Sequence, residues 1–369
     1  TRKESSAASD VYKRQVYNPR TRHLVSATRF VVTQAMLYRT TGEARYQVGM
    51  RHALTFLRTA FLDPATGGYA WLIDWQDGRA TIQDATRHCY GMAFVMLAYA
   101  RAYEAGVPEA RDWLAEAFQT TEKHFWQPAA GLYADEASPD WQLTSYRGQN
   151  ANMHACEAMI SAFRATGEHR YIERAEQLAQ GICQRQAALS TAALAPAAER
   201  WVWEHFHADW SVDWDYNRHD RSNIFRPWGY QIGHQTEWAK LLLQLDALLP
   251  ADWHLPCAQR LFDAAVERGW DAEHGAPLLR HGARRQHLRR RQIPLGAGRE
   301  HGGCSGACCS HGGCALLAVV QPHLDLRLGP LCGPRTWRVV SHPAPQQPQH
   351  HPREEQCGEG GLSQHGGVL

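Results

Sequence analysis

Apolar residues recur every three to four positions through most of the first 275 residues, the spacing that places them on one face of a helix. The pattern predicts helices in consecutive pairs, at 23–38 with 45–62, 85–103 with 108–125, 151–165 with 170–185, and 233–248 with 254–268. The residues of the first pair expected to face the core are Leu24, Val31, Val32, Met36, Ala53, Leu54, Leu57 and Phe61. The alanine-rich stretch 187–198 is interpreted as a linker or an insertion.

Two of the predicted turns share a motif. TGEARY occupies 41–46 and TGEHRY occupies 166–171, which are 166 − 41 = 125 residues apart. In the first copy Gly42 stands where a helix C-cap favours a left-handed backbone. Repeated helical hairpins predict an all-α domain, a toroid of paired helices in which one end of every inner helix lines a central cavity.

The helical pattern stops near Gly275. Beyond it come RRQHLRRRQ and HGGCSGACCSHGGC, followed by a segment rich in proline and glutamine. When the codons of 310–317 are read one base later, they permit RTGGARY, a third copy of the repeated motif. We therefore expect 276–369 to be the frameshifted and disordered remainder of the same domain. The alternative is a genuine basic or metal-binding Cys/His tail, and sequencing the gene across the Gly275 codon distinguishes the two.

The first residues also differ from the rest of the chain. The stretch 5–15, SSAASDVYKRQ, resembles a translated sequencing-library adapter, so 1–15 is set aside as an artefact. The folded domain is expected to occupy 16–275 and, as written, to lack both natural ends of the toroid.

Composition narrows the classes of function. Of 369 residues, 44% are hydrophobic and 21% charged, and the net charge is +2, which gives no support for nucleic acid as a partner. No apolar run approaches the roughly 20 residues that span a bilayer, so no membrane association is expected. Up to Gly275 the cysteines are widely spaced, which favours reduced thiols in a cytoplasmic protein over a disulfide framework or zinc site. These cysteines are Cys89, Cys156, Cys183 and Cys257.

Two histidines stand in patterns that suit chemistry. Asn150 and His154 are four apart at a predicted helix start and share one face, where an amide binds a hydroxyl and an imidazole exchanges a proton. The alternative is a helix-capping asparagine and a buried structural histidine. His234 opens another helix and Glu237 follows three positions later, a spacing at which a carboxylate orients an imidazole and raises its basicity. The alternative is a capping carboxylate beside a surface histidine.

Three weaker signals accompany them. Arg29 lies within an apolar stretch, where a charge is costly unless it is paired or binds an anion; otherwise it points to solvent. Tyr90 begins another apolar run, where most tyrosines belong to the core. The stretch 201–217, WVWEHFHADWSVDWDYN, combines indole faces with carboxylates, which suits sugar rings, although packing of long loops explains it equally well. P-loop, GxGxxG, HExxH and GxSxG motifs are absent, which argues against nucleotide enzymes, zincins and serine hydrolases.

Several of these motifs resemble the N-acylglucosamine 2-epimerase family, which includes mannose isomerases and cellobiose 2-epimerases. They are HLVSATRF at 23–30, RGQNANMH at 147–154 and FRPWGYQIGHQTEWAKLL at 225–242. The shifted frame adds DADKYHWVQAE and KSNAGKVDYHNMG. The resemblance covers the chain from 16 onward once the frame is restored. It implies an (α/α)6 barrel and cofactor-free, metal-independent isomerisation or epimerisation of a monosaccharide or disaccharide.

The resemblance also implies roles for individual residues. It makes His234 one of two acid/base histidines, supported by Glu237, and Arg29 the group that stabilises an enediolate. The second acid/base histidine lies in the DYHNMG of the shifted frame. The residues implied to contact the sugar are Asn150, His154 and Tyr90.

The expected reaction starts when a neutral histidine removes the C2 proton of an open-chain aldose. Return of the proton to C1 converts mannose into fructose, whereas return to the opposite face of C2 gives the epimer. HLVSATRF and GHQTEWAKLL favour mannose isomerisation, with 2-epimerisation of N-acylglucosamine, glucose/mannose or cellobiose as the alternative. Further alternatives are a non-catalytic carbohydrate- or protein-binding module and a glycoside hydrolase, although no carboxylate pair for hydrolysis is found. The sequence is compatible with a homo-oligomer.

Overall fold

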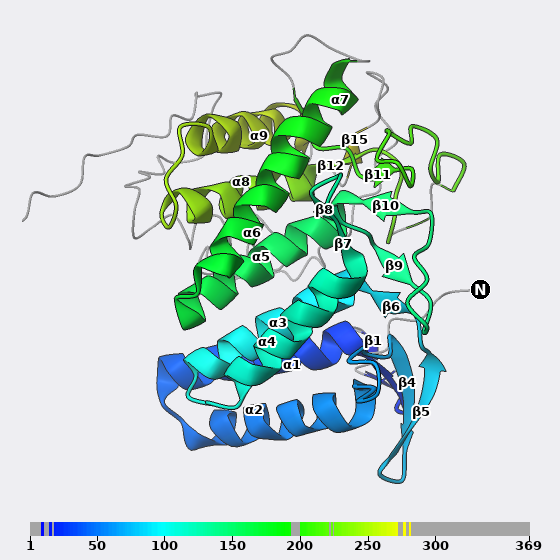
Figure 1. Cartoon of the computed structure of the whole chain (residues 1–369), viewed down its shortest axis with the longest axis vertical. Helices are drawn as coiled ribbons and strands as arrows, with labels where there is room; N and C mark the ends of the chain where they lie inside the picture. Colours follow the sequence, from blue (N-terminus) through cyan, green and yellow to red (C-terminus); the bar gives the residue numbers. More distant parts are fainter. Residues whose placement is uncertain are drawn as a thin grey trace, which may run out of the picture. The chain divides into compact units, whose positions relative to one another are not determined.

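A computed structural model describes residues 18–192, 200–220, 223 and 225–271, together with short strands at 9–10, 15–16, 276–277 and 280–281. The expected artefact at 1–15 and the expected frameshifted segment 276–369 lie, apart from those strands, outside the described residues. The helices form antiparallel pairs (Figure 1): α1 (Leu24–Thr41) with α2 (Ala44–Phe56), α3 (Cys89–Glu104) with α4 (Ala110–Phe125), α5 (Gln149–Thr166) with α6 (His169–Ala179), and α8 (Ile232–Asp246) with α9 (His254–Gly269).

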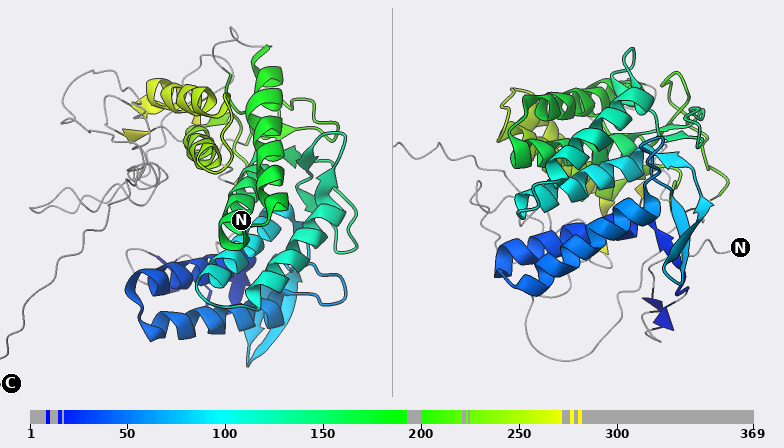
Figure 2. Two further views of the ribbon diagram at one scale, coloured as in Figure 1. Left: turned by 60° about the vertical axis from the view of Figure 1, so that its left-hand side comes forward. Right: turned by 60° about the horizontal axis from the view of Figure 1, so that its bottom comes forward.

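The pairs are arranged with one inner and one outer helix each. Helices α1, α3, α5 and α8 contact one another in that order, and each carries its pair partner on the outside. Figure 2 shows α3 to α6 between the α1/α2 pair and the α8/α9 pair. Inner α3 is buried at every position from Gly91 to Ala100, whereas outer α4 buries one stripe that includes Leu114, Phe118 and Phe125. This difference follows from the number of neighbours that surround each helix.

The repeated turn motif forms equivalent structures. Gly42 and Gly167 end α1 and α5 with φ of 71° and 73°, the left-handed conformation that glycine adopts without steric cost. Their N–H groups donate to the carbonyls of Tyr38 (2.8 Å) and Phe163 (2.7 Å). The predicted hairpin repeat and the all-α class are therefore confirmed.

Each hairpin is closed by a pair of short antiparallel strands. The strand before an inner helix pairs with a strand that follows the outer helix of the same hairpin. The pairs are β3 (Thr21–His23) with β4 (Leu72–Gln76), β6 (Arg87–His88) with β9 (Glu136–Ala137), β10 (Arg147–Gly148) with β11 (His205–Phe206), and β12 (Tyr230–Gln231) with β15 (Arg280–His281). The N-termini of the inner helices consequently lie at one end of the ring.

The remaining strands are short. Strand β5 (Arg79–Asp84) extends β3 and β4 into a three-stranded sheet. The other pairs are β1 (Ser9–Asp10) with β2 (Gln15–Val16), β7 (Trp126–Gln127) with β8 (Leu132–Tyr133), and β13 (Trp270–Asp271) with β14 (Ala276–Pro277).

Three local expectations need correction. The helix expected from 85 begins at Cys89, because the two preceding residues pair in β6. Met36 is 57% exposed, since it follows buried Ala35 and therefore lies about 100° around the helix from the buried stripe. The supposed linker begins as α7 (Ala187–Ala192), which continues from the π-helical η2 (Gln180–Gln186); residues 193–199 lie outside the described part. A second π-helical segment, η1 (Leu57–Phe61), ends α2.

The other core expectations fare better. Leu24, Val31 and the four residues predicted for the second helix are buried, and Val32 is partly buried. Cys89, Cys156, Cys183 and Cys257 are buried free thiols, as expected. In the part of the chain that the structure describes, no helix combines the length and apolarity required to cross a membrane.

Candidate active site

Residues next to the short strand pairs that close each hairpin place their side chains at the N-termini of the inner helices. The first N–H of an inner helix donates to the carbonyl of a residue beyond the outer helix, and the side chain of that same residue reaches the start of the next inner helix. Three positions share this arrangement. The carbonyl of Trp71 accepts from Leu24 (3.1 Å), and its ring lies tilted against that of His88 (4.0 Å between ring centroids). The carbonyl of Asp135 accepts from Cys89 (2.8 Å), and its carboxylate accepts from Gly148 (2.5 Å). The carbonyl of Glu204 accepts from Gln149 (3.2 Å), and its carboxylate lies 2.9 Å from Nδ1 of His234.

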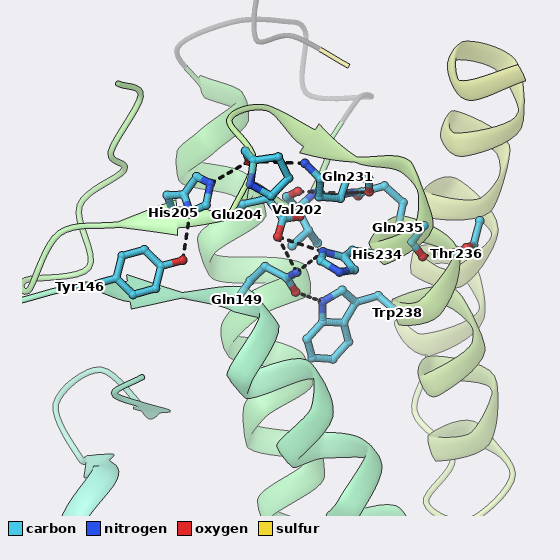
Figure 3. A network of polar contacts seen from close by, with 12 residues as sticks. Tyr146, Gln149, Val202, Glu204, His205, Gln231, His234, Gln235, Thr236 and Trp238 are labelled. Atoms are coloured by element: carbon cyan, nitrogen blue, oxygen red, sulfur yellow. Dashed lines mark hydrogen bonds and ion pairs between the residues drawn. The ribbon is translucent and has the colours of Figure 1, made fainter. Parts of the chain in front are cut away.

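His234 lies in the first turn of α8 and pairs with Glu204 (Figure 3). Nδ1 of His234 is 2.9 Å from Oε2 of Glu204. The carboxylate side chain is 5% exposed and the imidazole 25% exposed, so the pair is anchored in the core and open on the histidine side. Among the described residues, Nε2 of His234 has no hydrogen-bond partner, which leaves this nitrogen available to a ligand.

Gln149 fixes the arrangement from the first turn of α5. The indole of Trp238, which only donates, gives its N–H to Oε1 of Gln149 at 2.7 Å. The amide nitrogen of Gln149 therefore faces Glu204, at 2.9 Å from Oε2, and lies 2.8 Å from Nδ1 of His234. The carboxylate of Glu204 only accepts hydrogen bonds, so its contact with Nδ1 favours the tautomer with hydrogen on Nδ1 and a basic Nε2, whereas the donor amide of Gln149 near the same nitrogen favours the opposite tautomer. The negative charge of Glu204 makes its contact the stronger of the two.

The surroundings tune the basicity of His234. Burial by itself lowers the pKa of the imidazole, but the charge and hydrogen bond of Glu204, with a further contribution from the charge of Glu237, raise it above its ordinary value. A histidine with one nitrogen bonded to a carboxylate and the other free has the arrangement of a general base.

Glu237 lies one turn further along α8 and faces a different histidine. It belongs to a group with His154 and Glu157 whose potential ligand atoms lie within 4.8 Å of one another, close enough that they could hold a metal ion. Nδ1 of His154 is 3.1 Å from Glu157. Lys240 lies 3.3 Å from Glu157 and 3.7 Å from Glu237.

Tyr90 packs directly against His154, whereas Arg29 is connected to His154 through the ring of Phe94. The ring of His154 is 5.1 Å from Tyr90 and 4.9 Å from Phe94, and the guanidinium carbon of Arg29 lies 4.9 Å over Phe94. Burial, the largest influence, raises the pKa of Tyr90, although the charge of Arg29 opposes it. Arg29 is exposed, so its charge remains hydrated.

Asn150, one turn before His154, has a side-chain oxygen that is buried without a hydrogen-bond partner within the described structure. A buried unpaired amide oxygen costs about 1–3 kcal/mol. A sugar hydroxyl that reached it would remove this cost, which fits the expectation that Asn150 contacts substrate.

The structure places the six predicted residues in the N-terminal halves of the inner helices. His234 lies beside Glu204. The other five are His154 and, around it, Glu237, Asn150, Tyr90 and Arg29. One difference concerns the partner of His234. The carboxylate bonded to its imidazole is Glu204, whereas Glu237 acts on it only through charge and lies beside His154. The sequence reasoning missed Glu204 and Gln149.

The aromatic stretch 201–217 serves mainly as packing. Trp203 is fully buried and its ring lies 4.8 Å from Trp214 and 4.9 Å from Tyr230. The loop-packing interpretation is therefore favoured, and Glu204 is the residue of this stretch that reaches His234.

The four described hairpins are arranged as part of an α/α barrel, with a histidine–carboxylate pair at the N-terminus of inner helix α8. Residues 12–292 match the N-acylglucosamine 2-epimerase (GlcNAc 2-epimerase) family, and the chain belongs to this family.

Named relatives within the family include D-mannose isomerases. The chain is 49% identical over 261 residues to the D-mannose isomerase of Marinomonas mediterranea, which covers 70% of this chain and 63% of the relative. It is 39% identical over 225 residues to that of Thermobifida fusca, covering 60% of this chain and 53% of the relative. The matched region thus spans less than two thirds of either relative.

Solved structures agree with this placement. A crystal structure of D-mannose isomerase superimposes with a TM-score of 0.68 at 48% identity, over 73% of this chain and 66% of that one. Cellobiose 2-epimerase from Spirochaeta thermophila superimposes with a TM-score of 0.56 at 21% identity, over 67% and 60% of the two chains. These proteins are (α/α)6 barrels, so the predicted fold is confirmed.

Proposed function

We propose that the protein interconverts mannose and fructose without a metal ion, with His234 as an acid/base group. The observation that carries the proposal is the Nε2 of His234, which has no hydrogen-bond partner among the described residues, while Nδ1 is bonded to the buried Glu204. The 49% identity to a D-mannose isomerase supports the choice of substrate.

The proposed reaction begins with an open-chain aldose whose aldehyde acidifies the C2 proton. Nε2 of His234 takes that proton, and the negative charge of Glu204 stabilises the imidazolium that forms. Arg29 stabilises the enediolate oxygen through its positive charge. Delivery of a proton to C1, with transfer of the hydroxyl proton from the C2 oxygen to the C1 oxygen, then gives the ketose. The hydrogen removed from C2 either reaches C1 or is lost to solvent.

Asn150, His154 and Tyr90 hold the sugar in this proposal. The unpaired oxygen of Asn150 accepts a hydroxyl, and the imidazole of His154, fixed through Nδ1 by Glu157, presents its other nitrogen for ring opening. Epimerisation at C2 follows from the same enediolate when the proton returns to the opposite face of C2. The product therefore separates the two activities.

The test uses the full-length protein from a gene whose reading frame has been verified across the Gly275 codon. Mannose is incubated with a chelator present, and products are separated by chromatography. Fructose formation supports the proposal; glucose as the only product, or epimerisation of an N-acyl sugar supplied in a parallel reaction without turnover of mannose to fructose, reassigns the protein as an epimerase. With no turnover of any aldose, a binding module is favoured. The chain as written is expected to have little or no activity, and substantial activity from it overturns the frameshift hypothesis.

The assignment of His234 is tested by deuterium exchange. In heavy water the wild type should incorporate deuterium at C1 of the fructose product and at C2 of the recovered mannose, whereas His234→Ala should not. Exchange that persists in a folded His234→Ala variant removes this residue from the proton transfer.

A further inference from the structure

Lys240 occupies an unusual place for a lysine. Its side chain is 12% exposed and extends from the third turn of α8 toward α5, where its ammonium group meets two carboxylates. Nζ lies 3.3 Å from Oε1 of Glu157 and 3.7 Å from Oε1 of Glu237. A lysine this buried is stable only when its charge is paired.

The same two carboxylates and His154 form the group whose ligand atoms lie within 4.8 Å of one another. Metal ions such as Mn²⁺ bind carboxylate oxygen and imidazole nitrogen at about 2.1 Å, so opposite ligands stand roughly 4 Å apart. Small side-chain rotations therefore suffice to bring these three groups to an ion. The ammonium of Lys240 lies against the oxygens that such an ion would use.

We propose that Lys240 is a built-in cation, which occupies the place of a divalent metal ion between Glu157 and Glu237 and keeps that ion out. Two carboxylates this close repel each other, and one positive charge between them offsets the repulsion. The lysine supplies this charge permanently, through a covalent tether. The site consequently keeps its histidine and carboxylates in order without an ion from solution.

The arrangement also explains how His154 is held. Glu157 directs one oxygen to Lys240 and the other to Nδ1 of His154, at 3.1 Å. Lys240 is thus a positioning residue for His154, acting through Glu157. If the lysine is replaced by a neutral side chain, the two carboxylates and the imidazole gain a vacancy that a divalent cation fills.

The experiment measures Mn²⁺ binding, because Mn²⁺ prefers oxygen ligands and binds cysteine thiolates only weakly. Chelator-treated full-length wild type, Lys240→Met and Lys240→Arg are titrated by calorimetry, and their thermal unfolding is recorded with and without the ion. Lys240→Met should bind Mn²⁺ at least tenfold more tightly than wild type, and its melting temperature should rise when Mn²⁺ is added. Lys240→Arg, which keeps the charge, should behave as wild type.

Two double variants test whether the added Mn²⁺ affinity comes from this site. Adding Glu157→Gln or Glu237→Gln to Lys240→Met should return the affinity to the wild-type level. The proposal is overturned if Lys240→Met gains no affinity, or if wild type already binds Mn²⁺ in a manner that depends on Glu157. If Lys240→Met folds poorly, recovery of its native circular dichroism by Mn²⁺ supports the proposal and lack of recovery contradicts it. None of these readouts involves sugar turnover, so their failure leaves the proposed function untouched.

Discussion

Helix α8 has a histidine–carboxylate pair at each end, and the two pairs differ in which polar atoms remain free. At the first turn His234 bonds Glu204 through Nδ1, and its other nitrogen has no partner among the described residues. At the last turn Asp246 lies 3.6 Å from Nδ1 of His254, whose Nε2 bonds Glu176 at 2.7 Å. The pairs lie about 18 Å apart along the helix.

Burial separates the two histidines further. His254 is fully buried, and Glu176 also accepts hydrogen bonds from Trp253 (3.0 Å) and Gln180 (2.8 Å). That pair joins α6, α8 and α9 and leaves no face for a ligand. A histidine beside a carboxylate is therefore a catalytic candidate when one nitrogen remains accessible, and a structural clamp when acidic groups flank both nitrogens.

The largest expected effect is on catalysis at the first pair. His234→Ala should lower kcat/KM by about 10²–10⁴, the usual contribution of a general base. Its stability should change by less than about 1 kcal/mol, because Glu204 keeps the hydrogen bond from Gln149. Steady-state rates and thermal unfolding measure the two quantities. If His234→Ala loses stability but keeps its rate, His234 is a structural residue and the roles given to the two pairs are wrong.

The matched variant at the other end is His254→Ala. Removing a buried histidine that bonds a carboxylate should destabilise the protein by about 2–4 kcal/mol. That corresponds to a fall in melting temperature of roughly 5–15 °C for a domain of this size. The rate per folded molecule should remain near wild type. A drop in kcat comparable to that of His234→Ala would remove the distinction between clamp and catalyst.

Glu204→Gln tests how the first pair is tuned. Glu204 raises the pKa of His234, so the neutral imidazole becomes protonated at a higher pH in the wild type than it would without Glu204. Without that charge the effect of burial remains and the pKa falls. The acid limb of the kcat/KM–pH profile should therefore move to lower pH, with kcat reduced about tenfold. Glu237→Gln, the control, should move the limb in the same direction by a smaller amount.

The smallest effect concerns Glu176. Burial raises the pKa of this carboxyl, but hydrogen bonds from His254, Trp253 and Gln180 outweigh it and lower the pKa below its ordinary value. The stability it contributes is present above pH ~4.5 and is lost as the pH falls through the lower folded-state pKa. Glu176→Gln should cost about 1 kcal/mol at pH 7, and urea unfolding near pH 3 should show a smaller difference from wild type. A difference independent of pH contradicts this account.

The sequence predicted whatever depends on near neighbours in the chain. Helix periodicity located the hairpins, and the glycine of the repeated motif located two of their turns. The four-residue spacing of Asn150 and His154 correctly placed both on α5. The failure at 85–88 has a physical reason, because β6 pairs with a strand almost fifty residues later and that pairing overrides the local preference for helix.

The partner of His234 depends on contacts distant in sequence. Glu204 lies 30 residues before the histidine, and its position is set by the β10/β11 closure and by its carbonyl at the start of α5. A signal existed in the repeat, since Tyr69-Ala70-Trp71 and Tyr133-Ala134-Asp135 precede equivalent closures. Aligning these segments with Val202-Trp203-Glu204 would have marked position 204 as one that reaches the next inner helix.

The strand closures also bear on how the chain folds. Arg87 pairs with Ala137 across one hairpin, and Arg147 pairs with Phe206 across the next. Each strand pairing therefore joins the two ends of a single hairpin. Each hairpin is thus able to close without contacts from the hairpins that follow it, and residues such as Glu204 can be in place before the helix they serve packs against them.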